Sequence, residues 1–153
     1  MRLYLDTSAI VPLILSEPAT GLCSQLWKAA IHVSTVRIAF VEAAAALAMA
    51  ERLKRISEEQ HLSCLKTLRK LWGMIDVVEV SDDLTVIAAD LARRHGLRGY
   101  DAVHCAAALT MKEDPALVAA AGDARLLAAW RAMGIATSDT NSARDYANSM
   151  SSR

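Results

Sequence analysis

Short apolar runs alternate along the chain with longer segments that have a helical pattern. Each run is short, and most are bounded by polar, glycine or acidic residues, as strands commonly are. The runs predict strands at residues 3–5, 31–36, 77–80 and 117–121, with a weak one at 135–137. Because buried-looking strands alternate with helices, the pattern indicates an α/β fold with a mainly parallel sheet covered on both faces.

The segments between the strands predict helices with recognisable ends. Ser57, three residues before a glutamine, has the pattern of a capping box that opens one helix. Gly96 marks the end of another. The first helical stretch begins at Ser8, is interrupted by Pro18 and resumes as far as about residue 30. The others are predicted at residues 37–53, 57–73, 81–95, 100–112 and 123–133.

The length of 153 residues is enough for one domain and too little for two ordinary ones. Apolar residues make up 54% of the chain and charged residues 22%, a composition that can bury enough surface to offset the entropy of ordering. A disordered chain is therefore excluded. We expect a single domain over residues 1–138. Residues 139–153, rich in Ser, Asn and Asp, are expected to form a polar tail or a loose final helix.

Charge and cysteine content narrow the function classes further. The charges of the 17 basic and 17 acidic residues cancel. We therefore do not expect binding to nucleic acid through overall positive charge, although a local basic rim is compatible with this composition. The three cysteines are widely spaced and predict neither a disulfide framework nor a zinc site. Asp6 and Pro12 interrupt the apolar N-terminal run, unlike a signal peptide, and the longest alanine-rich run is too short to cross a bilayer. We therefore expect a cytoplasmic protein.

Two acidic residues directly follow predicted strands. Asp6 comes after residues 3–5, and Asp123 comes after residues 117–122. In a parallel α/β sheet, ligands bind at the carboxyl ends of the strands, so both positions are candidates for a functional site. Each residue is equally well interpreted as the N-cap of the helix that follows it. The pattern alone does not decide between a site residue and a helix cap.

Glu42 lies on a predicted helix rather than at the end of a strand. Its helical stripe includes Met49 and Leu53 and is expected to face the core. An ionised carboxylate is costly there unless a cation compensates it. The alternative is a rotated helix that places Glu42 at the solvent boundary, paired with Arg37 or Arg52.

Asp101 lies in the first turn of another predicted helix, where acids are common because they complement the helix dipole. As a set, the two strand-end acids and the two helix acids can converge on one cleft of a parallel sheet. Carboxylates brought together repel one another unless divalent cations neutralise them, and hard oxygen ligands suit Mg²⁺ or Mn²⁺. Such a site activates water and stabilises the charge that develops during phosphodiester hydrolysis.

The sequences that surround these acids resemble the PIN-domain family. The resemblance rests on LDTSAI at residues 5–10, Glu42 in its alanine-rich helix, GYDAVHCAAAL at 99–109 and GDARLL at 122–127. The length and layout resemble the VapC branch of that family, the toxins of type II toxin–antitoxin pairs. The resemblance extends from residue 1 to about residue 138.

This resemblance implies a three-layer α/β/α fold and a Mg²⁺- or Mn²⁺-dependent ribonuclease. The matching positions for the metal-binding and catalytic acids are Asp6, Glu42, Asp101 and Asp123. Ser8 stands where a small hydroxyl residue often supports that site, and Thr7 is the neighbouring hydroxyl. The family also implies a homodimer and an antitoxin protein that lays an amphipathic segment over an apolar groove and often directs a basic side chain at the acids.

Several other residues have a weaker connection to this chemistry. Arg93, Arg94 and Arg98 form the best local basic cluster; they could guide an RNA backbone, although solvated surface is the interpretation we favour. His104 lies one turn after Asp101, and we interpret it as a hydrogen-bonded packing histidine rather than a metal ligand. Cys105 is expected to be a small buried residue.

Two other functions are compatible with parts of the pattern. A phosphohydrolase of the haloacid dehalogenase type also begins with a strand that ends in Asp, but it needs a second Asp where this chain has Ser8. The remaining alternative is a catalytically inactive PIN-like module that binds RNA or a partner. Many relatives carry Thr or Ser shortly before the last acid, whereas this chain has Ala-Ala-Ala-Gly at 119–122. That departure leaves Asp139 as an alternative to Asp123.

Overall fold

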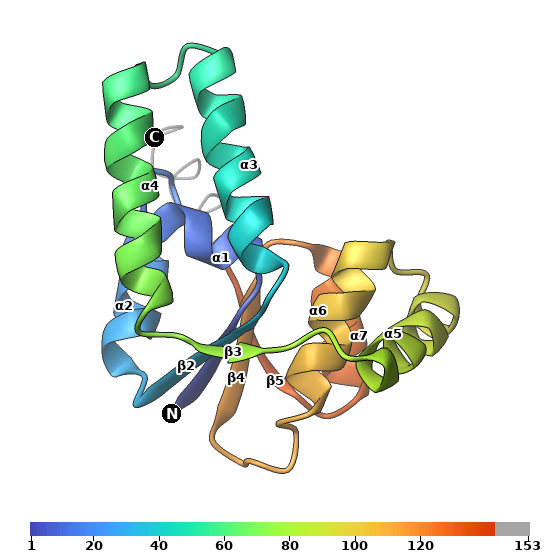
Figure 1. The fold of residues 1–153 in the computed structure, drawn as a ribbon. Coiled ribbons are helices and arrows are strands. Elements are labelled where there is room, and N and C mark those ends of the chain that lie inside the picture. The colour runs from blue at the N-terminus through green and yellow to red at the C-terminus, as the bar shows by residue number, and fades with distance from the viewer. Residues whose placement is uncertain (143–153) are drawn as a thin grey trace, which may run out of the picture.

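A computed structural model describes residues 1–142, which are built around a five-stranded sheet (Figure 1). The strand order is β3-β2-β1-β4-β5, and every neighbouring pair is parallel. The strands are β1 (Arg2–Leu5), β2 (His32–Val36), β3 (Asp76–Val78), β4 (Leu117–Ala121) and β5 (Ala136–Asp139). The predicted parallel sheet is confirmed, with β4 at its predicted bounds and the other strands shifted by one or two residues at their ends.

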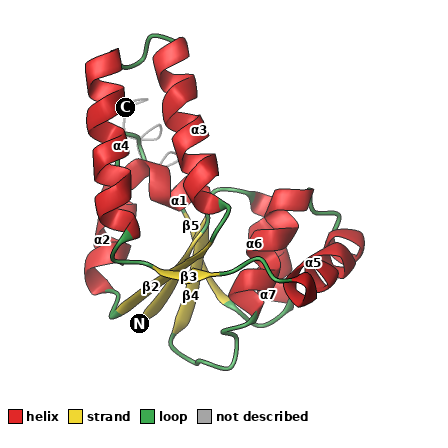
Figure 2. Ribbon diagram, in the orientation of Figure 1, coloured by secondary structure: helices red, strands yellow, loops and turns green. Residues whose placement is uncertain are grey.

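Helices cover both faces of the sheet, which gives the expected three-layer α/β/α arrangement (Figure 2). The helices are α1 (Thr7–Ile10), α2 (Thr20–Ala29), α3 (Ala39–Arg52), α4 (Glu58–Trp72), α5 (Asp82–His95), α6 (Gly99–Leu109) and α7 (Ala124–Ala132), with a short 3₁₀ turn at Val11–Leu13. Helices α1 to α4 share one hydrophobic core with one face of the sheet, and α5 to α7 share a second core with the other face.

Strand β1 shows how the sequence builds the two cores. Successive side chains of a strand point to opposite faces, so Leu3 and Leu5 enter the core beneath α1 to α4 while Tyr4 enters the core beneath α5 to α7. All three side chains are fully buried. This central strand therefore anchors both layers and carries Asp6 at its carboxyl end.

Local signals set most helix ends where they were predicted. The Ser57 capping box is formed, and Gly96 ends α5 with φ of 63°, in the left-handed region that suits glycine. Two predicted helices are longer than those observed. Before Pro18, the stretch that begins at Ser8 forms only α1 and a 3₁₀ turn with Pro12 near its start, and α2 covers the part after Pro18. Helix α6 ends at Leu109 rather than near residue 112, with Thr110 at its C-cap.

The prediction for the buried stripe of α3 was wrong. The buried residues of α3 are Ala39, Ala43, Leu47 and Ala50, whereas Met49 and Leu53 are 54% and 65% exposed. The buried residues recur at i+3 or i+4 and are mostly small, which suits close packing against α4 and α1. The stripe of Glu42 therefore follows the border of the core rather than its centre.

Strand β5 extends the sheet to Asp139, one residue beyond the predicted domain boundary. Of the predicted tail, residues 140–142 are also described, and residues 143–153 lie outside the described residues. Within residues 1–142, none of the helices combines the length and the apolar character that a membrane span requires.

Candidate active site

Asp6 and Ser8 connect the carboxyl ends of β1 and β4. Asp6 is buried and caps α1: its Oδ2 accepts hydrogen bonds from the Ser8 amide at 3.0 Å and the Ser8 hydroxyl at 2.6 Å. The amide of Gly122, just after β4, donates in turn to the Ser8 hydroxyl at 2.8 Å. A cap role and a site role are therefore compatible for Asp6, because capping uses only one of its two oxygens.

Glu42 lies in the first turn of α3 and turns toward β1. Its Oε2 accepts hydrogen bonds from Thr7 Oγ1 and from His104 Nε2, both at 2.8 Å. Burial raises the pKa of this carboxyl, but the hydrogen bond and charge of His104, together with Thr7, lower it below its usual value. The alternative pairing with Arg37 is not observed, since Arg37 pairs with Glu79.

Asp101 and Asp123 lie on either side of one arginine. Arg98, at the N-cap of α6, places Nε 2.9 Å from Asp101 Oδ2 and Nη2 3.7 Å from Asp123 Oδ2. Asp123 also caps α7, with Oδ1 accepting from the amides of Arg125 and Leu126 at 2.9 Å. The hydrogen bond from Arg98 to Asp101 and the charges of the two aspartates raise the pKa of the guanidinium.

His104 joins this group from the buried side. Its side chain is fully buried, and Nε2 lies 2.8 Å from Glu42 Oε2 and 3.4 Å from Asp6 Oδ1. Burial lowers the pKa of the imidazole, but the hydrogen bond to Glu42 and the charge of Asp6 outweigh it, so the pKa is raised. The prediction that His104 is buried and hydrogen-bonded is confirmed, but its Nε2 contacts two of the candidate acids, Glu42 and Asp6.

The sequence reasoning missed this link between His104 and the acids. The available signal was its spacing: a residue three positions after Asp101 lies on nearly the same helix face. The other ring nitrogen of His104 forms a hydrogen bond with the hydroxyl of Tyr4, a buried residue of the central strand β1. No sequence pattern connects Tyr4 with His104.

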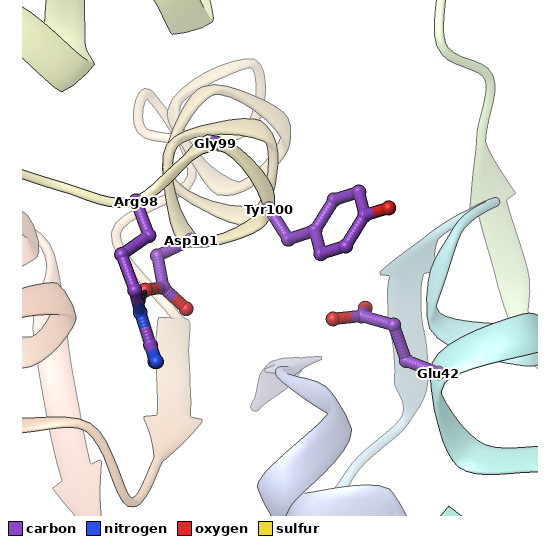
Figure 3. A pocket seen from close by; sticks show the side chains of 5 residues that line it. All are labelled: Glu42, Arg98, Gly99, Tyr100 and Asp101. Carbon is purple, nitrogen blue, oxygen red and sulfur yellow. Dashed lines mark hydrogen bonds and ion pairs between the residues drawn. The ribbon is translucent and has the colours of Figure 1, made fainter. Parts of the chain in front are cut away.

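Glu42 and Asp101 line a hollow between α3 and α6 (Figure 3). The cleft has a volume of about 480 Å³ and is lined by Glu42, Arg98, Gly99, Tyr100 and Asp101. The carboxylate of Glu42 points across the cleft toward Asp101, and the ring of Tyr100 extends over the space between them (Figure 3). A second hollow of about 380 Å³ continues past Arg98 to Asp123 and Ala124. All four candidate acids are thus brought to one end of the sheet.

The donor chemistry of the site fits a hard divalent cation. Each carboxylate has one oxygen held by protein donors, and the other accepts no hydrogen bond from residues 1–142. These free oxygens, in the sense that they accept no hydrogen bond, are Asp6 Oδ1, Glu42 Oε1, Asp101 Oδ1 and Asp123 Oδ2. Two of them still have a basic side chain nearby, since Asp6 Oδ1 lies 3.4 Å from His104 Nε2 and Asp123 Oδ2 lies 3.7 Å from Arg98 Nη2. In the arrangement observed, no group of three Asp, Glu, His or Cys side chains within residues 1–142 is set to hold a metal ion, and the basic groups beside the acids are the guanidinium of Arg98 and the imidazole of His104. Cation binding therefore requires a rearrangement, for which Arg98 is suited because its side chain is 79% exposed.

The other candidate residues make no hydrogen bond or ion pair with the four acids within residues 1–142. Asp139 ends the edge strand β5 opposite Ala121 of β4, and its carboxylate accepts from the amide of Asn141. Arg94 pairs with Asp90 on its own helix, and Arg93 is exposed near the end of α5. Of the three arginines in the basic cluster, Arg98 alone contacts the acids within the described part of the chain.

Comparisons with known proteins agree with this fold. The chain is 38% identical over 123 residues to ribonuclease VapC45 of Mycobacterium tuberculosis, a match that covers 80% of this chain and 85% of the relative. The fold is similar to PAE2754 from Pyrobaculum aerophilum, with a TM-score of 0.65, 22% identity and coverage of 90% and 83% of the two chains. It is also similar to a chain of a toxin–antitoxin complex from Klebsiella pneumoniae, with a TM-score of 0.60, 15% identity and coverage of 82% and 90%. The PIN domain family matches residues 3–132. The chain therefore belongs to the PIN-domain family.

Proposed function

We propose that this protein is a Mg²⁺- or Mn²⁺-dependent endoribonuclease, the toxin of a type II toxin–antitoxin pair. The observation that carries the proposal is the convergence of four carboxylates on one end of the parallel sheet, each with an oxygen that accepts no hydrogen bond from the described residues. The name of its relative VapC45, a ribonuclease, supports the same activity.

In this proposal the cation is held by the free oxygens of Asp6, Glu42, Asp101 and Asp123. A bound cation supplies a water of lowered pKa and stabilises the charge that develops on the phosphate. Ser8 and Thr7 hold the two carboxylates nearest β1, so their free oxygens stay directed at the cleft.

Arg98 contributes a mobile positive charge at the mouth of the cleft. It neutralises Asp101 and Asp123 in the absence of other cations, and once released it can pair with a phosphate of the RNA backbone. Arg93 and Arg94 lie on the preceding helix α5 and extend the basic surface available to the same strand of RNA.

The partners follow from the same assignment. We propose a single domain that includes β5 and acts in the cytoplasm as a homodimer restrained by an antitoxin protein. The likeness to a chain from a toxin–antitoxin complex supports an antitoxin partner. A basic side chain of that antitoxin could pair with the acids as Arg98 does here.

Cleavage of total cellular RNA by the purified, antitoxin-free protein tests this function. Reactions contain Mg²⁺, Mn²⁺ or EDTA and compare the wild type with Asp6→Asn and Asp101→Asn, with Asp83→Asn, an exposed residue of α5, as the matched control. We expect discrete fragments that require metal, vanish in both site variants and persist in the control. A folded wild type that neither binds metal nor cleaves RNA contradicts the proposal and favours the inactive binding module.

A further inference from the structure

One buried imidazole contacts two of the four carboxylates from the core side. Nε2 of His104 lies 2.8 Å from Glu42 Oε2 and 3.4 Å from Asp6 Oδ1. Because an ionised carboxylate only accepts hydrogen bonds, Nε2 must carry the proton in this contact. The same N–H group therefore donates to Glu42, on α3, and lies beside the Asp6 carboxylate, at the end of β1.

The other nitrogen of the ring is also fixed. The hydroxyl of the fully buried Tyr4 lies 3.0 Å from His104 Nδ1. A hydroxyl can donate to this nitrogen or accept from it, so the contact holds the ring in either of its charge states. Trp130 packs edge-on against the Tyr4 ring at 5.8 Å between centroids, which restrains the tyrosine in turn. Rotation of the imidazole would break its contacts with both Tyr4 and Glu42.

This restraint determines which oxygen of Glu42 faces the cleft. Oε2 already accepts from His104 and from Thr7, so it is occupied on the buried side. The carboxylate as a whole is directed across the cleft toward Asp101 (Figure 3). A carboxylate held at one oxygen by two donors presents the other oxygen in a defined direction, which is what cation binding needs.

We propose that His104, held in place by Tyr4, is a positioning residue that sets the relative placement of Glu42 and Asp6 for cation binding. This inference rests on the proposed function, because it concerns the same site. It assigns the imidazole no bond to the metal and no part in proton transfer.

The Mn²⁺ dissociation constant, measured by calorimetry, tests the proposal without RNA. The variants are His104→Leu, His104→Gln and Tyr4→Phe, with Leu91→Ala, in the same core on α5, as the structural control. Loss of a group that orients metal ligands typically weakens metal binding about 10- to 100-fold, which we expect for His104→Leu. His104→Gln should recover part of the affinity because its amide can donate to Glu42. Tyr4→Phe should weaken binding less than His104→Leu, and Leu91→Ala should lose stability with unchanged affinity.

A second readout uses the metal-free protein and separates this inference from the proposed function. In ¹H–¹⁵N spectra of the imidazole, Glu42→Gln should shift the Nε2 signal and Tyr4→Phe the Nδ1 signal. A wild type that binds no Mn²⁺ contradicts the proposed function. A wild type that binds Mn²⁺, with wild-type affinity in folded His104→Leu, overturns the positioning role alone. If His104→Leu does not fold, Tyr4→Phe decides: unchanged affinity and an unchanged Nδ1 signal overturn the proposal.

Discussion

Ser8 offers a quantitative test of how the strand ends are held. Its hydroxyl donates to Asp6 Oδ2 at 2.6 Å and accepts from the Gly122 amide at 2.8 Å, so Ser8→Ala removes both contacts. A hydrogen bond to a charged group contributes about 1.5–3 kcal/mol, and an exposed residue belongs at the low end. The Ser8 amide still holds the same oxygen at 3.0 Å. We therefore expect the free energy of unfolding to fall by about 1 kcal/mol, or roughly 2–4 °C in Tm.

Urea unfolding in EDTA measures this loss, with Ser16→Ala as an exposed serine control. The same variant should bind Mn²⁺ about tenfold more weakly, because Asp6 loses one of the donors that orient it. Calorimetry with Mn²⁺ checks that second effect. Ser8→Ala with unchanged stability and unchanged Mn²⁺ affinity would refute the idea that this hydroxyl holds the two strand ends together.

Three further changes test the electrostatics and the packing. Arg98→Met should tighten Mn²⁺ binding about two- to fivefold, because it removes a competing cation, and should raise the KM for RNA; an unchanged Mn²⁺ titration would contradict this. Burial raises the pKa of the Cys105 thiol to about 12, so iodoacetamide at pH 8 should modify it only after unfolding, as mass spectrometry would show. Leu47→Ala should cost about 2–5 kcal/mol and Leu53→Ala less than about 0.5 kcal/mol, with equal losses in urea unfolding speaking against the observed α3 stripe.

The fold was predictable because its signals are local and repeated. Strand β4 and the ends of α4 and α5 follow from short runs, a capping box and a glycine in the left-handed region. The orientation of α3 was not predictable in the same way. Alanines populate several of its stripes, so hydrophobicity alone does not decide which stripe is buried.

The acids of the candidate site could be predicted from the sequence, but the contacts among its residues could not. Asp6 and Asp123 stand out because strand ends are marked in the sequence, and Glu42 stands out against its apolar neighbours. The pairing of His104 with Glu42 joins residues 62 positions apart and depends on how α3 and α6 dock. The contact of Tyr4 with His104 spans 100 positions and is likewise a product of packing.

The most direct test of the account is the position of Mn²⁺ in crystals of the antitoxin-free protein, located by its anomalous scattering. The account predicts a peak bordered by the free oxygens of Asp6, Glu42, Asp101 and Asp123, with Arg98 moved away from Asp101. The peak should be absent from Asp101→Asn crystals. No peak among these carboxylates at saturating Mn²⁺, or a peak elsewhere on the chain, would contradict the central claim that they form one cation site.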